Sequence, residues 1–143
     1  MPLASVWLIR LALIQLLSGS ILGAAYLSLK AGGPFDWVAS HRSVHVEQML
    51  VGWMVQLVIG VAYYILPRAE GSSLRGPLIW IVLLLINAGV VLAALGTAPG
   101  FPAMLTLIGR IAEALAAGLF LNDRVESAAA LSRGGPPGAC LRS

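Results

Sequence analysis

The chain has 143 residues, of which 59% are hydrophobic and only 10% are charged. Soluble domains carry about 25% charged residues, so this composition excludes a water-soluble globular protein and indicates an integral membrane protein. Nine Lys and Arg against six Asp and Glu give a net charge of +3. The basic residues are spread singly, which argues against nucleic acid as a partner. The single cysteine, Cys140, excludes an internal disulfide, a cysteine zinc site and an iron–sulfur cluster.

Four apolar runs predict four transmembrane helices. Each run is about 19 to 24 residues long, enough to cross a hydrocarbon core of about 30 Å as a helix. The predicted spans are at about 6–29, 44–66, 77–95 and 101–121. We therefore expect an all-α membrane protein with a four-helix transmembrane bundle over residues 1–125, in which the short Gly96–Gly100 loop joins the last two helices as an antiparallel hairpin. Residues 126–143 are rich in Ser, Arg, Gly and Pro and are expected to form a disordered cytoplasmic tail.

Charge bias between the loops predicts the orientation of the bundle. With four spans, the side that holds both termini carries six arginines: Arg10, Arg68, Arg75, Arg124, Arg133 and Arg142. The opposite side carries only Lys30 and Arg42, so the positive-inside rule puts both termini in the cytoplasm and the Lys30–Arg42 loop outside. We expect a multi-pass protein of the plasma (inner) membrane. The first run could instead be a cleaved signal peptide, but it continues unbroken to Lys30, which favours its retention.

Small residues at helical spacing offer surfaces for close helix contacts. The first run has Gly19 and Gly23, and the fourth has Ala114 and Gly118. Such pairs pack helices within one chain or between subunits. Both interpretations stay open from the sequence.

The second run carries the most informative pattern. Six residues recur at three- and four-residue steps and form one stripe on a helix: His45, Met49, Gly52, Gln56, Gly60 and Tyr63. The stripe starts with an imidazole and continues with two glycines. A flat macrocycle lying along a helix needs an axial ligand and then a surface free of side chains, and the stripe offers both. Spacing alone also allows a solvated interfacial histidine and glycines that pack against another helix.

Several residues around this stripe match a known family. They are an Arg before a His, a Gly-Trp pair, a Gly-x-Ala-Tyr-Tyr segment and a Pro-Arg exit, here Arg42, His45, Gly52-Trp53, Gly60-Val-Ala-Tyr-Tyr64 and Pro67-Arg68. This pattern resembles the second transmembrane helix of subunit I of the haem–copper oxidase superfamily, closest to its nitric-oxide reductase and C-type cytochrome oxidase branch. The histidine of that helix is an axial ligand of the low-spin haem near the outer face. The resemblance therefore implies that His45 binds the iron of a haem b, with Arg42 and the stripe residues around it.

The resemblance covers the second run well and the first run loosely. In the family, the copper ligands, the high-spin haem ligand and the second low-spin haem ligand lie in helices that this sequence lacks. The resemblance thus implies a small, truncated relative without its own oxygen- or nitric-oxide-reducing centre.

Other polar and sulfur-containing residues have alternative roles. His41 and His45 are one turn apart and could bind a divalent metal jointly, or His41 could be a surface loop residue. Arg110 and Glu113 could form a salt bridge on one helical face, or Arg110 could pair with an anion elsewhere, such as Glu47 or a haem propionate. Three methionines, for which core packing is the alternative, could be axial thioether ligands: Met49, Met54 and Met104.

Taken together, these features predict a haem b-binding membrane protein that acts in electron transfer as a subunit of a redox complex and is not catalytic alone. The competing interpretation is a haem-free accessory or assembly subunit. The last two runs hold no donor equivalent to His45. We therefore expect a second copy of the chain in a homo-oligomer, or another membrane redox subunit, to supply the second haem ligand. In one such arrangement, two His45 side chains related by a two-fold axis bind one shared haem. A quinone or an external electron carrier is the candidate reaction partner.

Overall fold

The computed structural model describes residues 2–34, 36–66, 77–98 and 100–133, and their regular structure is helical. The elements in chain order are α1 (Leu3–Lys30), the 3₁₀ helix η1 (Asp36–His41), α2 (Arg42–Glu47), the π-helix η2 (Gln48–Val55), α3 (Gln56–Ile65), α4 (Pro77–Leu95) and α5 (Met104–Arg133). Because α2, η2 and α3 follow one another without a break, they form a single crossing over Arg42–Ile65, termed the second span.

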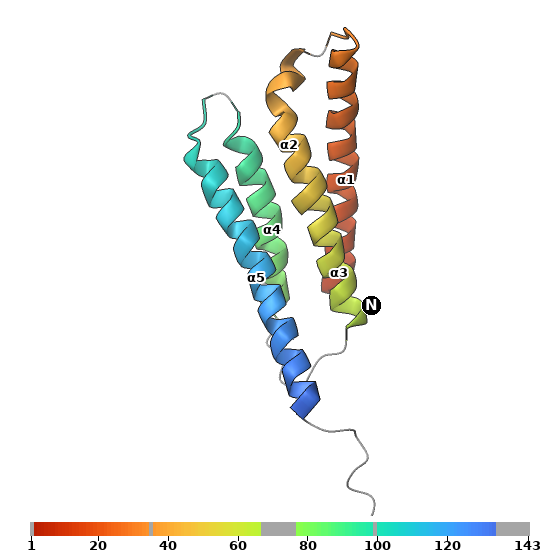
Figure 1. Ribbon diagram of the computed structural model, residues 1–143, viewed down its shortest axis with the longest axis vertical. Coiled ribbons are helices and arrows are strands. Elements are labelled where there is room, and N and C mark those ends of the chain that lie inside the picture. The colour runs from red at the N-terminus through yellow and green to blue at the C-terminus, as the bar shows by residue number, and fades with distance from the viewer. Residues whose placement is uncertain (1, 35, 67–76, 99, 134–143) are drawn as a thin grey trace, which may run out of the picture.

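Four stretches are long and apolar enough to cross a membrane, which confirms the predicted number of spans. They are Leu3–Lys30, Arg42–Ile65, Pro77–Leu95 and Met104–Ala129. Large apolar side chains point outward along them, as in Leu84, which is 64% exposed. A surface of this kind suits lipid, because the helices satisfy their own backbone hydrogen bonds. The beginning of α1 and the end of α5 lie at the same end of the bundle (Figure 1).

The bundle consists of two antiparallel hairpins (Figure 1). One is formed by α1 and the second span, the other by α4 and α5, and contacts within each hairpin are much more extensive than those between them. Leu8, Ile59 and Ile86 belong to the buried cluster that joins the two hairpins. In the second hairpin the backbones nearly touch, since a Cβ on Gly109 would lie 2.5 Å from the backbone nitrogen of Ala93. This close approach confirms that the Gly96–Gly100 connection joins an antiparallel pair.

A π-helix occupies the centre of the second span, where the sequence predicts an ordinary helix. The backbone hydrogen bonds of η2 reach five residues along the chain instead of four, which makes the helix wider. Gly52 lies within η2 and is buried against α1, because a Cβ there would come within 3.0 Å of the Gln15 side chain. The wide turns and the missing side chain therefore occur at the same level of the bundle.

The last helix is longer than predicted. We expected a disordered tail from Glu126, but α5 continues to Arg133. The amide of Asn122 donates a hydrogen bond to Glu126 Oε1 one turn later, at 2.9 Å, and Asp123 and Ser127 are buried. These interactions support helix beyond the apolar run. The remainder of the expected tail, with Cys140, lies outside the described residues.

We expect Gly109→Ala to destabilise the hairpin of α4 and α5 by about 1–3 kcal/mol, because the added methyl group has no space without a backbone shift. Gly118→Ala is the matched control on the same helix, since a Cβ there meets nothing within 4 Å. Both substitutions gain the same helix propensity. Unfolding of the purified protein in detergent measures the difference, and equal stability of the two variants would contradict the close approach.

Candidate functional site

The predicted stripe does lie along one face of the second span, but for most of its length that face packs on α1. A Cβ on Gly60 would lie 3.0 Å from Leu8 Cβ, and the sulfur of Met49 would be 2.9 Å from a Cβ on Gly19. Gly52 is covered by Gln15. The glycines of the stripe therefore make room for α1. The surface that we expected beneath a macrocycle is filled by the first helix.

Two buried hydrogen bonds also join α1 to this stripe. Gln56 Nε2 donates to the carbonyl oxygen of Leu8 at 3.2 Å. From the other helix, Ser5 Oγ donates to the carbonyl oxygen of Gly60 at 2.6 Å. Polar groups buried at membrane depth are costly unless they are hydrogen-bonded. These bonds thus hold the hairpin together and give Gln56 a structural role.

His45 belongs to α2, which lies at the end of the bundle opposite the beginning of α1 (Figure 1), and its ring contacts α1. Its Nδ1 is 2.7 Å from the carbonyl oxygen of Gly19. A carbonyl can only accept, so Nδ1 carries the hydrogen in this contact and, in the neutral ring, Nε2 holds the lone pair. The imidazole packs on Gly23, where a Cβ would lie 2.7 Å from its Cε1. Gly19 and Gly23 of α1 therefore leave the space that the Met49 and His45 side chains occupy.

This geometry fits one part of a haem site. A metal-binding histidine typically donates its second ring N–H to a backbone carbonyl or a carboxylate, which fixes the tautomer. The bond from His45 to Gly19 has that form. The glycine surface does not fit, because α1 covers it. The residues present thus suit the ligand atom of a haem, and a macrocycle has no place on the stripe itself.

Other predicted site residues lie apart from this imidazole. Arg42 is exposed at the start of α2. Tyr63 is buried near the other end of the span, where the Arg124 guanidinium lies 5.8 Å from its ring centre. His41 takes part in interactions of its own. Within the described ranges, no group of three His, Cys, Asp or Glu could hold a metal ion.

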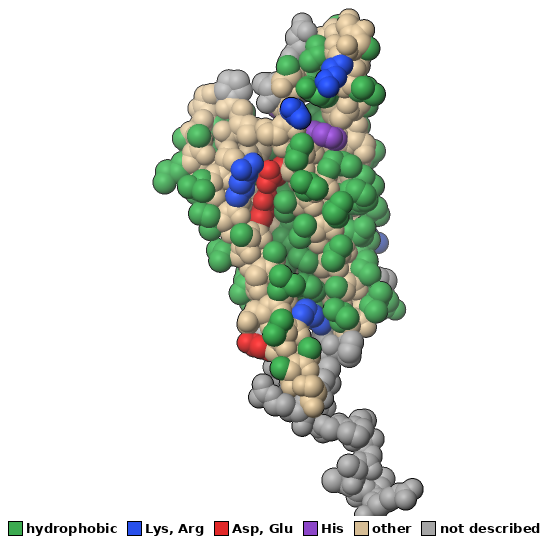
Figure 2. Space-filling view, in the orientation of Figure 1, with side chains coloured by type: hydrophobic (Ala, Val, Ile, Leu, Met, Phe, Trp, Pro, Cys, Tyr) green, Lys and Arg blue, Asp and Glu red, His purple; other side chains and the backbone are tan. Residues whose placement is uncertain are grey.

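A second polar site joins the two hairpins and is termed the charged cluster; it consists of Glu47, Arg110 and Glu113. Arg110 Nη2 lies 3.5 Å from Glu47 Oε2, so the arginine pairs across helices, as one of the two alternatives predicted. Glu113 follows Arg110 by three residues, about one helical turn, on the same face of α5. Figure 2 shows acidic and basic side chains side by side at the boundary between the hairpins.

Glu113 is the most enclosed member of the charged cluster. Its side chain is 8% exposed and passes over α4, where a Cβ on Gly89 would lie 2.6 Å from its Cγ. Among the described residues, its Oε1 has no hydrogen-bond partner. The guanidinium of Arg110 faces outward, with 60% of the side chain exposed. The charged cluster therefore has a hydrogen-bond acceptor without a partner, Glu113 Oε1, inside the membrane span of α5.

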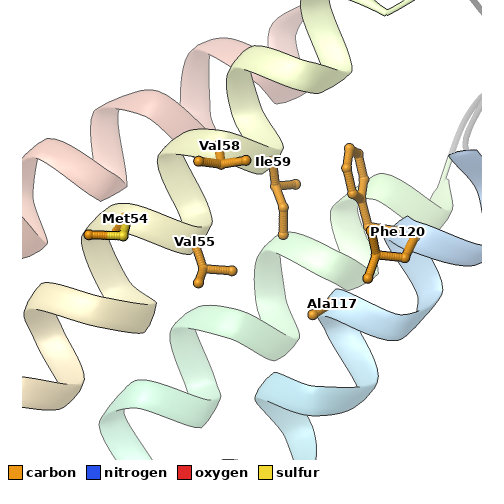
Figure 3. A pocket seen from close by; sticks show the side chains of 7 residues that line it. Met54, Val55, Val58, Ile59, Ala117 and Phe120 are labelled. Carbon is orange, nitrogen blue, oxygen red and sulfur yellow. The ribbon is translucent and has the colours of Figure 1, made fainter.

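An apolar pocket also lies between the two hairpins. Its volume is about 250 Å³, and its walls come from the second span and α5 (Figure 3). The lining residues are Met54, Val55, Val58, Ile59, Ala117, Phe120 and Leu121. Met54, a candidate thioether ligand, is thus part of an apolar wall.

Sequence reasoning missed the partners that orient His45 and the stripe. The acceptors of His45 and Gln56 are backbone carbonyls of α1, which no side-chain pattern reveals. The available signal was the polar character of Gln15, within the first apolar run, and of Ser5, directly before it.

Comparison of the chain with protein-family models, curated proteins and solved structures finds no match.

We expect Gly23→Ala to displace the His45 ring, because the new methyl group would approach Cε1 to 2.7 Å. The Nδ1–H bond to Gly19 should weaken and the tautomers should mix. Nitrogen NMR of selectively labelled histidine measures the tautomer, with Gly118→Ala as the control that touches nothing. An unchanged nitrogen NMR signal of His45 in Gly23→Ala would contradict the contact between the ring and Gly23.

Proposed function

We propose that the chain is a haem b-binding membrane protein that acts in electron transfer as a subunit of a redox complex, with His45 as an axial ligand. The observation that carries the proposal is the bond from His45 Nδ1 to the Gly19 carbonyl, which leaves Nε2 as the donor atom. The resemblance of the segment from Arg42 to Tyr64 supports it. The Pro67-Arg68 part of the pattern lies outside the described residues.

Each residue near this imidazole has a defined task under the proposal. The Gly19 carbonyl makes the ring more basic and holds its orientation. Gly23 leaves space for the ring. A bound haem supplies one-electron transfer. The protein acts as a carrier without its own oxygen- or nitric-oxide-reducing centre.

The second axial donor is proposed to come from outside the chain. α4 contains no His or Met, and the only such residue in α5 is Met104, which is 68% exposed at the start of its helix. A second copy can present the same histidine from the other side, since a two-fold axis relates identical residues. A different membrane redox subunit is the other source.

The second candidate function is a haem-free accessory or assembly subunit. The packing of α1 over Gly52 and Gly60 favours it, because the stripe is then fully explained as a helix interface. The visible absorption spectrum of the detergent-purified protein tests both candidate functions.

The detergent-purified protein should show a Soret band and a sharp reduced alpha band. His45→Ala should abolish both while the bundle still inserts, because the iron loses its protein ligand. His41→Ala is the matched control and should keep them. A Soret band that survives unchanged in His45→Ala overturns the ligand assignment, and a wild-type protein without haem after expression with added haem favours the accessory subunit.

Haem stoichiometry then identifies the second donor. One haem per two chains with a bis-histidine spectrum supports two His45 side chains on one shared haem. One haem per chain excludes sharing and indicates a donor from another subunit or an open sixth position.

The proposed orientation has both termini in the cytoplasm, a plasma (inner) membrane location and the Lys30–Arg42 loop outside, because of the excess of arginine on the terminal side. In a Cys140→Ser background, Ala31→Cys should react with a membrane-impermeant maleimide in intact cells. Ser132→Cys, also at an exposed position, should react only after permeabilisation. The reverse pattern of labelling would show the opposite orientation.

A further inference from the structure

The charged cluster and the apolar pocket both lie between the second span and α5, since Arg110 pairs with Glu47 there and the same two elements line the pocket. The space between these two elements is termed the groove. Glu113 precedes Ala117 of the pocket by four residues, which is about one helical turn, or 6 Å. The pocket then extends along α5 to Leu121 and along the second span from Met54. A polar end and an apolar end therefore follow each other along the groove, which matches a molecule with a polar head and an apolar tail.

The polar end lies deep in the span. Glu113 is nine residues into α5, about 13 Å along the helix axis at 1.5 Å per residue. In a hydrocarbon core of about 30 Å this is near the middle. Lipid tails offer nothing to the outward-facing Arg110 guanidinium or to the buried, unpartnered Glu113 Oε1, and such groups are costly in lipid without polar partners.

The shape of the pocket limits what can enter it. One turn of an α-helix with its side chains is about 10–12 Å across and about 5.4 Å long. Its volume exceeds that of the pocket, which is about 250 Å³. A flexible hydrocarbon or isoprenoid chain fits such a space. The pocket thus favours a small amphipathic molecule over a helix of a partner protein.

The charge of the polar end selects the head group. A phospholipid head carries a phosphate that belongs at the membrane surface, and Glu47 and Glu113 would repel it. A neutral head with both hydrogen-bond donors and acceptors matches the cluster, because a carbonyl can accept from Arg110 and a hydroxyl can donate to Glu113.

We propose that the groove binds a lipid-soluble quinone and its quinol, with the head at the charged cluster and the tail in the pocket. The choice of a quinone among neutral polar heads rests on the proposed electron-transfer function. Binding itself does not require haem.

A photoreactive decyl quinone tests the site in the full chain, reconstituted in phosphatidylcholine nanodiscs. We expect saturable labelling of peptides that contain Met54–Ile59 and Ala117–Leu121. An excess of unlabelled decyl quinone should prevent it, and decylbenzene, which lacks the polar head, should not. Labelling that does not saturate, that spreads to lipid-facing Leu84, or that decylbenzene prevents equally well overturns the proposal.

Variants locate the two ends of the ligand. Ala117→Trp fills the pocket and should weaken binding at least about tenfold, whereas Leu115→Trp, at a position 56% exposed on the lipid side of α5, should leave it unchanged. Val58→Trp narrows the pocket from the opposite wall and replaces Ala117→Trp if that variant does not insert. Glu113→Ala should also weaken binding, through loss of the head contact. Unchanged affinity in an inserted pocket variant overturns the proposed site.

The two proposals fail independently. His45→Ala should lose the Soret band and keep saturable quinone labelling, because the groove lies on the other side of the second span. Loss of labelling in Ala117→Trp with an intact Soret band would support the groove separately. A wild-type protein with haem but no saturable labelling rejects the quinone site alone.

Discussion

The contact between α1 and the second span determines where each candidate functional group lies. Lipid provides no hydrophobic force that would press two apolar helices together, so close packing and interhelical hydrogen bonds hold them. Glycines on both helices allow the approach, and Ser5, Gln56 and His45 each bond to a backbone carbonyl of the opposite helix. The same contact fixes the imidazole, covers the stripe and leaves the other side of the second span to face α4 and α5.

The sequence was sufficient for the crossings because hydropathy is a local property. Each run had to be helical, since a single segment in lipid must satisfy its own backbone, and the short connection after Leu95 left α4 and α5 no arrangement except an antiparallel hairpin. The stripe from His45 to Gly60 also follows from helical spacing alone. Pairing of Arg110 with Glu47 was one of two alternatives, and only the packing of the hairpins decided between them.

The partner of the stripe could not be predicted for a physical reason. In a soluble protein, apolar periodicity marks the face that avoids water, but a membrane helix is apolar on both its lipid and its protein faces. Glycines then indicate a close neighbour without identifying it, so α1 and a macrocycle satisfied the pattern equally. The π-helix is likewise invisible in the residue pattern. The extension of α5 beyond Glu126 depends on the buried Asp123 and Ser127, whose burial requires the tertiary structure.

His45 and Glu47 are two residues apart and serve opposite sides of the second span, one against α1 and the other against α5. The packing differs on the two sides, since α1 fits closely around the imidazole while the two hairpins contact each other much less extensively. A ligand that must hold one geometry belongs on the close side, because tightly packed side chains have few alternative positions. A molecule that must enter and leave belongs on the loose side, where the groove already opens between the hairpins. Under the two proposals, the second span separates a fixed site at His45 from an exchangeable site that begins at Glu47, two residues further along the same helix.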